Sequence, residues 1–260
     1  MPALSTLAHG VRFELKAMLR NPRARFFTLI FPVVMLVVLC GLAGNGTTTQ
    51  GGEVIKLARF YVPAILALAI VTSCFGALTQ SIVTRRHLGV FKRRRTAPVP
   101  AWSLVLGQSL ANTAVALTTV VVLLIAGKAV YGIGLATPGL VAVALTIVLG
   151  AICFCAVAFA VSSVIPSPDA AQPIVQALLL PLYFISGIWL PMDSLPSGVQ
   201  AVGNAFPVAH LASALHRAFA HDTLAGAISM RDLAVLAAWT VGAEIVATRR
   251  FSWLPARATA

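Results

Sequence analysis

Residues 60–83 read FYVPAILALAIVTSCFGALTQSIV, and this stretch decides the fold. It contains no charged side chain, and basic residues flank it on both sides, at Arg59 and at Arg85. A helix needs about 20 apolar residues to cross the ~30 Å hydrocarbon core of a bilayer. A helix also satisfies its own backbone hydrogen bonds there, which an open loop does not. The stretch is therefore predicted to be a transmembrane helix.

Five further apolar runs extend this pattern to both ends of the chain. Of the 260 residues, 59% are hydrophobic and only 10% are charged, whereas a soluble domain has roughly 25% charged residues. This composition excludes a disordered chain, a nucleic-acid-binding domain and an ordinary soluble enzyme. We expect an all-α, polytopic membrane protein with six transmembrane helices in a single domain over residues 1–260. The predicted spans cover residues 26–43, 60–83, 104–126, 139–162, 173–190 and 233–248.

The distribution of basic residues predicts the orientation. The net charge is +12, and basic residues concentrate in segments that alternate along the chain. Since Lys and Arg accumulate on the cytoplasmic side, both termini are predicted to be cytoplasmic. Fourteen basic residues then lie inside: Arg12, Lys16, Arg20, Arg23, Arg25, Arg85, Arg86, Lys92, Arg93, Arg94, Arg95, Arg249, Arg250 and Arg257. Five lie outside: Lys56, Arg59, Lys128, Arg217 and Arg231.

Two further segments are amphipathic rather than uniformly apolar. Residues 1–25 carry an apolar stripe at helical spacing and are predicted to form a helix at the inner membrane interface. Residues 191–231 are broken by three prolines yet are too apolar for an ordinary loop, which favours a re-entrant segment on the outer side. Within it, residues 207–221 form a second amphipathic helix. Its polar face carries His210, Ser213, Arg217 and His221, and we interpret these histidines as solvated.

The inner connection over residues 84–103 carries more than charge. It contains Gly89-Val90-Phe91-Lys92-Arg93-Arg94-Arg95-Thr96-Ala97-Pro98. Topology explains part of its basic character. However, Val90 and Phe91 add an apolar spot among the charges, and Gly89 and Pro98 punctuate the segment as a short helix with defined ends. An aromatic ring beside several guanidinium groups suits docking into a groove on another protein.

This connection resembles the cytoplasmic loop of type-2 ABC exporter permeases, in which Gly89, Lys92, Arg93, Arg95 and Pro98 match. A second block, residues 178–219, is similar to the same family at Ser186-Gly187, Pro191, Leu195-Pro196 and Pro207. Among subclasses, the chain looks most like bacterial drug-efflux permeases of the daunorubicin-resistance kind. It departs from the pattern just ahead of Gly89, where the family usually has an acidic residue and this chain has Arg85, Arg86, His87 and Leu88.

The resemblance implies a multi-pass permease of the bacterial inner membrane that works with two cytoplasmic ATPase subunits and a second permease copy, identical or paralogous, among membrane lipids. The sequence contains no GxxxxGK[ST] motif, so we expect no bound cofactor on this chain and ATP with Mg²⁺ on the partner. Residues 163–172 would make a minor contact, and residues 191–231 would form an exit gate. The expected ATPase-coupling residues are Arg85, Arg86, Gly89, Phe91, Lys92, Arg93, Arg94, Arg95 and Pro98.

Polar and aromatic side chains within the spans are candidates for the substrate pathway. Gln108 and Asn112 lie one turn apart, and we interpret them as interhelical hydrogen-bonding residues, with a translocation role as the alternative. Tyr183 and Phe184 are weaker candidates that could stack on a flat apolar drug. Glu244 is expected to pair toward the interior of the bundle or with Arg249 or Arg250, with a proton-coupling role as the alternative. All four cysteines lie in apolar runs and are interpreted as small apolar residues without a disulfide or a metal: Cys40, Cys74, Cys153 and Cys155.

Two other classes of protein fit this sequence less well than an ATP-driven exporter does. A proton-coupled secondary drug transporter usually carries acidic or basic relays in its spans, and Glu244 is the only acidic candidate. It also often shows inverted repeats, and none is found. An intramembrane enzyme is disfavoured because the sequence lacks HExxH, GxSxG and an embedded pair of Asp residues. The prediction is thus a non-enzymatic permease that exports a hydrophobic drug or a lipid-like molecule.

Overall fold

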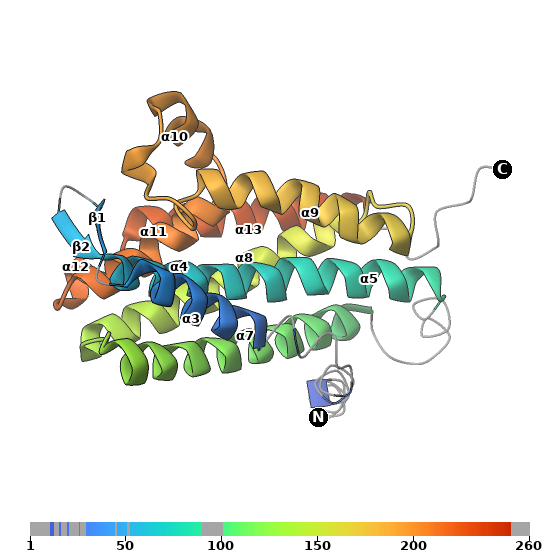
Figure 1. Ribbon diagram of the computed structural model, residues 1–260. Helices are drawn as coiled ribbons and strands as arrows, with labels where there is room; N and C mark the ends of the chain where they lie inside the picture. The colour runs from blue at the N-terminus through green and yellow to red at the C-terminus, as the bar shows by residue number, and fades with distance from the viewer. Residues whose placement is uncertain are drawn as a thin grey trace.

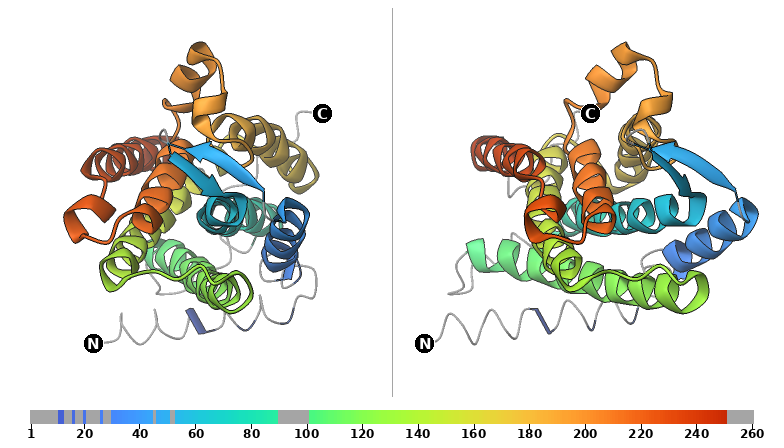
Figure 2. Two further views of the ribbon diagram at one scale, coloured as in Figure 1. Left: turned by 60° about the vertical axis from the view of Figure 1, so that its left-hand side comes forward. Right: turned by 90° about the vertical axis from the view of Figure 1, so that its left-hand side faces the viewer.

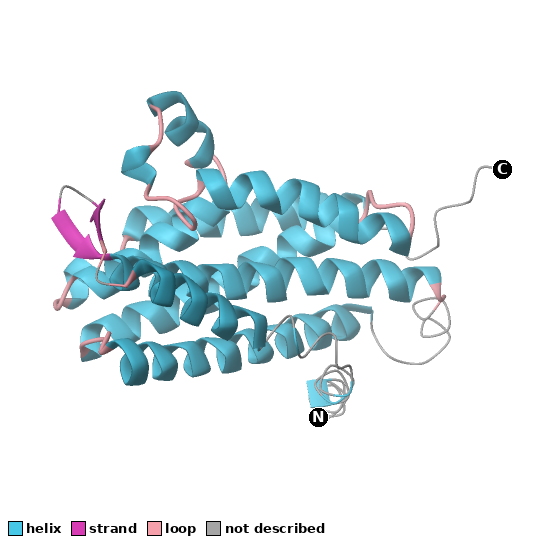
Figure 3. Ribbon diagram, viewed as in Figure 1, coloured by secondary structure: helices cyan, strands magenta, loops and turns pink. Residues whose placement is uncertain are grey.

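The computed structural model describes residues 30–44, 46–50, 53–89 and 101–250, with single positions at 11, 12, 16, 20 and 26 (Figure 1). Most of the predicted N-terminal interfacial helix, residues 90–100 of the inner connection and residues 251–260 lie outside this description. Within the described ranges the chain is almost entirely helical (Figure 3). The exception is an antiparallel hairpin of β1 (Thr47–Gln50) and β2 (Glu53–Lys56), in which Thr47 pairs with Lys56. The sequence did not predict this hairpin.

Three helices are long and apolar enough to cross a membrane. They run over Leu57–His87, Gly107–Tyr131 and Thr137–Ser162, and they contain the predicted spans 60–83 and 139–162 and most of 104–126. The first consists of α4 (Leu57–Val71), a π-helical segment η2 (Thr72–Ala77) and α5 (Leu78–His87). The second lies in α7 (Ala101–Tyr131), and the third is α8 (Thr137–Ser162). The fold is therefore that of a polytopic α-helical membrane protein.

The other predicted spans coincide with helices whose ends differ. The first, residues 26–43, contains the shorter apolar helix α3 (Phe31–Ala43). The fifth predicted span covers residues 173–190, but the corresponding helix α9 covers Pro168–Ile185. Its start is fixed by Ser167, whose hydroxyl accepts a hydrogen bond from the Ala170 amide. Its end precedes Gly187, which adopts a left-handed φ of 76°. The sixth helix, α13 (Met230–Arg250), is longer than predicted.

The helix Leu57–His87 forms the centre of the bundle. Its most apolar stretch is 83% buried, against 44% for α7 and 56% for α8. Other helices surround it in both views of Figure 2. The largest fully buried side chains include Ile65, Leu66, Ile70, Leu78 and Ile82 from this helix alone. The core of the protein is thus built around one continuous helical segment, Leu57–His87 (the rod).

The segment between α9 and α13 forms short helices. These are η3 (Met192–Ser194), α10 (Ser197–Gly203), α11 (Pro207–Ala220) and α12 (Leu224–Ala227). In Figure 1, α10 stands away from the bundle, whereas α11 packs into it against α4, α8 and α13. Two glycines of α8 allow α11 to approach closely. A Cβ at Gly150 would lie 2.6 Å from Leu211 Cδ1, and one at Gly139 would lie 2.6 Å from the Ala218 carbonyl oxygen.

The connections gather at two ends of the bundle (Figure 1). The hairpin end holds β1–β2, the turn before α8, and α12. The basic end holds the last turn of α5, the connection from α8 to α9 over residues 163–167, and the end of α13. Successive connections along the chain alternate between these ends, so long helices that follow one another in the sequence run in opposite directions.

Candidate functional site

The last turn of α5 is joined to the connection between α8 and α9 by a buried arginine. Arg86 is only 4% exposed. Its Nη1 donates a 2.9 Å hydrogen bond to the Ser162 carbonyl oxygen, and its Nη2 donates to the carbonyl oxygen of Ile165. These carbonyls lie at and just beyond the C-terminus of α8, where the helix leaves carbonyl groups without intrahelical partners and carries partial negative charge. A guanidinium is the side chain best suited to that position, because its planar fork reaches two acceptors.

A second contact along the same face of α5 strengthens this junction. Gln80 Nε2 donates a 3.3 Å hydrogen bond to the carbonyl oxygen of Pro168, the first residue of α9. Between the two polar contacts, Val83 packs with Ile165 and Ala171 in a small buried cluster. Gln80, Val83 and Arg86 are three residues apart and therefore line one face of the helix. The end of α8, the connection and the start of α9 are thus all held by α5.

The structure divides the predicted coupling residues into three groups. Arg86 is buried and bonded within the chain, so its contribution to coupling would be to hold the two connections together. Arg85 is half-buried, while Gly89 adopts a left-handed φ of 66° where its amide bonds the Arg86 carbonyl, which closes α5. The remaining predicted residues lie outside the described part of the chain: Phe91, Lys92, Arg93, Arg94, Arg95 and Pro98.

At the hairpin end, α11 is fastened to α13 by a buried polar cluster. His210 is 4% exposed and Asp232 is 6% exposed. His210 Nδ1 lies 2.6 Å from Asp232 Oδ1, and Nε2 lies 2.9 Å from the Asn204 carbonyl oxygen. The Ser213 hydroxyl donates a 2.9 Å hydrogen bond to Asp232 Oδ2. Both ring nitrogens of His210 therefore lie within hydrogen-bonding distance of an oxygen atom.

This cluster corrects the interpretation of His210 as a solvated residue. The polar face of α11 was identified from its spacing, but the face at His210 packs against α13 instead of facing water. Ser213, Arg217 and His221 are exposed, as expected. Sequence reasoning missed Asp232. The available signal was an acidic residue immediately before an apolar run, where an unpaired charge is unfavourable and a partner must be sought.

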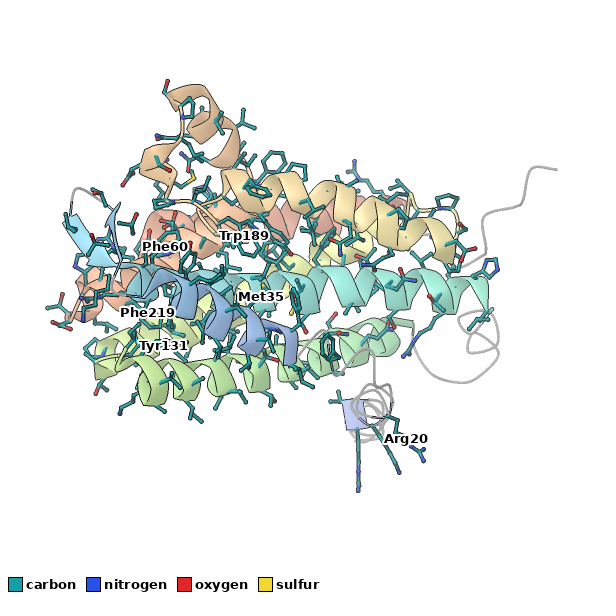
Figure 4. All side chains as sticks on the ribbon, viewed as in Figure 1. Arg20, Met35, Phe60, Tyr131, Trp189 and Phe219 are labelled. Atoms are coloured by element: carbon teal, nitrogen blue, oxygen red, sulfur yellow. The ribbon has the colours of Figure 1, made fainter. Side chains whose placement is uncertain are left out.

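The C-terminal half of α11 is fastened to the rod. Arg59 Nη2 donates a 3.0 Å hydrogen bond to the Phe219 carbonyl oxygen, in the last turn of α11. His216 of α11 also contacts Phe60 of the rod: its Nε2 lies 3.1 Å from the Phe60 carbonyl oxygen, and the centroids of the two rings are 4.9 Å apart. Figure 4 labels Phe60 and Phe219 at the hairpin end of the molecule. The rod is therefore anchored to α11 at one end and to the α8–α9 connection at the other.

Of the two amide side chains on the third predicted span, Gln108 forms an interhelical hydrogen bond and Asn112 an intrahelical one. Gln108 is 3% exposed, and its Nε2 donates a 2.9 Å hydrogen bond to Ser81 Oγ on α5. Asn112 is 8% exposed, and its Nδ2 donates to the Gln108 carbonyl oxygen one turn earlier. The bond from Gln108 to Ser81 is the kind of interhelical contact expected from the first interpretation.

The aromatic candidates do not share one surface. Tyr183 is 5% exposed, and its hydroxyl has no hydrogen-bond partner among the described residues. Phe184 is 52% exposed, and its ring centroid lies 6.5 Å from that of Trp189. Adjacent residues of a helix point about 100° apart, so the two rings face different neighbours. Only Phe184 is placed to meet a molecule outside the bundle.

Glu244 does not pair with Arg249 within the described structure: both side chains are exposed, and no ion pair joins them. The four cysteines are buried, as expected for small apolar residues. Among the described residues, no group of His, Cys, Asp or Glu side chains is arranged to hold a metal ion.

Comparison with known families identifies the family of this chain. Residues 8–219 match the family model described as "ABC-2 type transporter". The chain belongs to the ABC-2 transporter family. It is the membrane permease of such a transporter and not itself an ATPase, as the sequence predicted. Permeases of ABC transporters work with ATP-binding subunits.

Two curated relatives of this permease cover similar parts of it. The first is the daunorubicin resistance ABC transporter permease protein DrrB1 of Streptomyces coeruleorubidus, which is 28% identical over 199 residues, 75% of this chain and 68% of the relative. The second is the inner membrane transport permease YadH of Escherichia coli K12, which is 21% identical over 194 residues, 74% of this chain and 75% of the relative. With the long apolar helices, these relatives confirm the predicted location in a bacterial inner membrane.

Proposed function

We propose that this permease is the membrane subunit of an ATP-driven exporter that moves a hydrophobic drug or a lipid-like molecule outward. The proposed assembly has two permease copies and two cytoplasmic ATPase subunits. The observation that carries the mechanism is the rod, because one continuous helix leads from α11 at the hairpin end to the basic connection that follows His87.

The charge distribution supports the proposed orientation. At the basic end, Arg85 and Arg86 close α5 and Arg249 lies near the end of α13, whereas Lys56 and Arg59 lie at the hairpin end. The alternation of connections between the two ends is what six antiparallel spans require. On the positive-inside rule the basic end is cytoplasmic, and so are both termini.

In this proposal, an ATPase subunit binds the connection over residues 84–103. Phe91 would be the apolar anchor, and Lys92, Arg93, Arg94 and Arg95 would meet acidic groups at the rim of the groove. ATP binding then shifts the permease between two states only if the ATPase binds the connection differently in each state. The outer segment, residues 191–231, would act as the exit gate, because α11 is bonded directly to the rod.

The daunorubicin-resistance relative supports an apolar cargo for this permease. Two features agree with such a cargo: most of the buried side chains are apolar, and Phe184 and Trp189 form an aromatic pair at the end of α9. An aromatic face of this kind stacks on a flat apolar ring system. We use daunorubicin as the first probe, followed by a panel of other apolar compounds and lipids.

Charge reversal in the basic connection tests the coupling. We expect Arg93→Glu with Arg95→Glu to insert normally, to release the ATPase subunit on purification, and to lose ATP-dependent daunorubicin accumulation in inverted vesicles. The matched control is Arg249→Glu with Arg257→Glu, which reverses two charges on the same side but outside the connection. Intact copurification in the first variant would rule out this connection as the docking element. Accumulation driven by a proton gradient without any ATPase would favour a secondary transporter instead.

A further inference from the structure

The last turn of α5, where the basic connection over residues 84–103 begins, and the connection from α8 to α9 form one structural unit whose centre is Arg86. Its guanidinium spans the Ser162 and Ile165 carbonyl oxygens, and Gln80 reaches the Pro168 carbonyl oxygen from the same helical face. The three acceptors belong in turn to the end of α8, the connection itself and the first residue of α9. A single stripe of α5 thus fixes the complete reversal of the chain from α8 to α9.

Burial makes this contact hard to release. A guanidinium that is 4% exposed has lost its water, and the carbonyls at the helix end are its compensating partners. Pulling α5 away from the connection would leave a charge and two carbonyl groups unpaired in an apolar cluster with Val83. Side chains next to this centre remain available: Leu88 is 60% exposed and Val164 is 64% exposed.

We propose that Arg86 is the positioning residue that makes these two connections move as one body during ATP-driven transport. The proposal rests on the proposed function and assigns how the ATPase stroke is distributed within the permease. A displacement received by the connection after α5 is passed through Arg86 to α8 and α9, in addition to its passage along the rod to α11. Arg86 itself does not contact the ATPase, because its fork is already occupied.

The relative movement of the connections is the direct test. Spin labels are attached to cysteines at Leu88 and Val164, in a variant whose four buried cysteines are replaced by Ala, and the distance between the labels is measured by pulsed electron paramagnetic resonance. In the purified transporter complex, singly labelled variants identify the distances between the two permease copies; we expect the remaining distance, between the two labels of one copy, to be narrowly distributed with an unchanged maximum in the nucleotide-free and ATP-bound states. A distance that changes on ATP binding in the wild-type background overturns the proposal.

Substitution of Arg86 identifies the residue responsible. Arg86→Met is expected to broaden the label distribution and to lower daunorubicin transport per ATP hydrolysed by about tenfold or more, while ATP hydrolysis by the complex persists. Arg86→Lys should restore part of the coupling, because an ammonium keeps the charge but lacks the fork. Arg249→Met removes one exposed charge from the same end and should change neither readout. Wild-type distances and transport ratios in both Arg86 variants would overturn the assignment.

The experiments still decide the question if a variant does not accumulate or if no ATPase subunit binds the permease. If Arg86→Met does not accumulate in the membrane, Arg86→Lys and the wild-type nucleotide comparison still decide the question. If no ATPase subunit binds the wild-type permease, the proposed function fails; the label distance in the permease alone then still tests whether Arg86 holds the connections together.

Discussion

Removal of the Asp232 carboxylate should destabilise the permease by an amount that the structure allows us to work out. Asp232→Ala removes the acceptor of His210 Nδ1 and of the Ser213 hydroxyl together. A hydrogen bond to a charged group contributes about 1.5–3 kcal/mol, whereas hydrogen bonds between helices in a membrane average only ~0.6 kcal/mol. Breaking a buried ion pair costs about 3–5 kcal/mol. Because Ser213 is exposed and its bond is discounted, we expect a loss of about 2–4 kcal/mol.

The four buried cysteines provide the assay. A fluorogenic thiol-reactive dye reaches Cys40, Cys74, Cys153 and Cys155 only when the protein unfolds, since all four are buried. In a protein of this size, 1 kcal/mol corresponds to about 2–4 °C in melting temperature, so Asp232→Ala should melt about 4–16 °C below the wild type. The matched control is Asp222→Ala, which removes an exposed carboxylate at the same end and should melt with the wild type.

A double-mutant cycle separates the pair from general disruption. Once Asp232 is replaced, His210→Ala should cause little additional loss, because the two residues act as one unit. A melting temperature for Asp232→Ala within about 1 °C of the control would refute the reasoning, as would fully additive effects of the two substitutions.

Three further substitutions test other parts of the structure. Gly150→Val should lower stability by about 1–3 kcal/mol, because its Cβ would lie 2.6 Å from Leu211 Cδ1, whereas Gly242→Ala, which has open space around it, should be tolerated; equal melting temperatures in the thiol assay would contradict this. Tyr183→Phe should be as stable as the wild type or up to about 1 kcal/mol more stable, since it removes a buried hydroxyl that has no partner among the described residues; a clearly lower melting temperature would reveal a hydrogen bond there. Phe184→Ala should reduce daunorubicin resistance in growing cells at unchanged membrane abundance, and unchanged resistance would remove Phe184 from the substrate pathway.

The sequence predicted the elements that apolar length determines. Three predicted spans coincide with long helices because an uninterrupted apolar run of that length has few alternatives. The error at α9 arose because the apolar run continues to Leu190, while Ser167 and the left-handed Gly187 set the actual ends. The hairpin β1–β2 was missed because its short, threonine-rich strands carry little apolar signal.

The sequence predicts less of the candidate site than of the fold. Spacing placed His210 on the polar face of α11, but it does not reveal what lies opposite that face, and Asp232 is 22 residues away in sequence. Arg86 was one basic residue among six in its connection, and its partners are backbone carbonyls 76 and 79 residues away. Carbonyl groups are present at every position, so no sequence pattern distinguishes an arginine that will bind a helix end from one that will face a partner.

The π-helical segment Thr72–Ala77 divides the rod between its two anchored ends. Such a segment accommodates one residue more than regular α-helical turns would hold, and it does so without altering the helical phase beyond it. Homologous permeases that lack one residue here can therefore close the segment into ordinary turns and still present arginines equivalent to Arg59 and Arg86 to the same acceptors. In an alignment of this family, a single-residue gap between Val71 and Leu78 is consequently compatible with an unchanged architecture, whereas a gap elsewhere in the rod would rotate one anchored end by about 100° away from its partner.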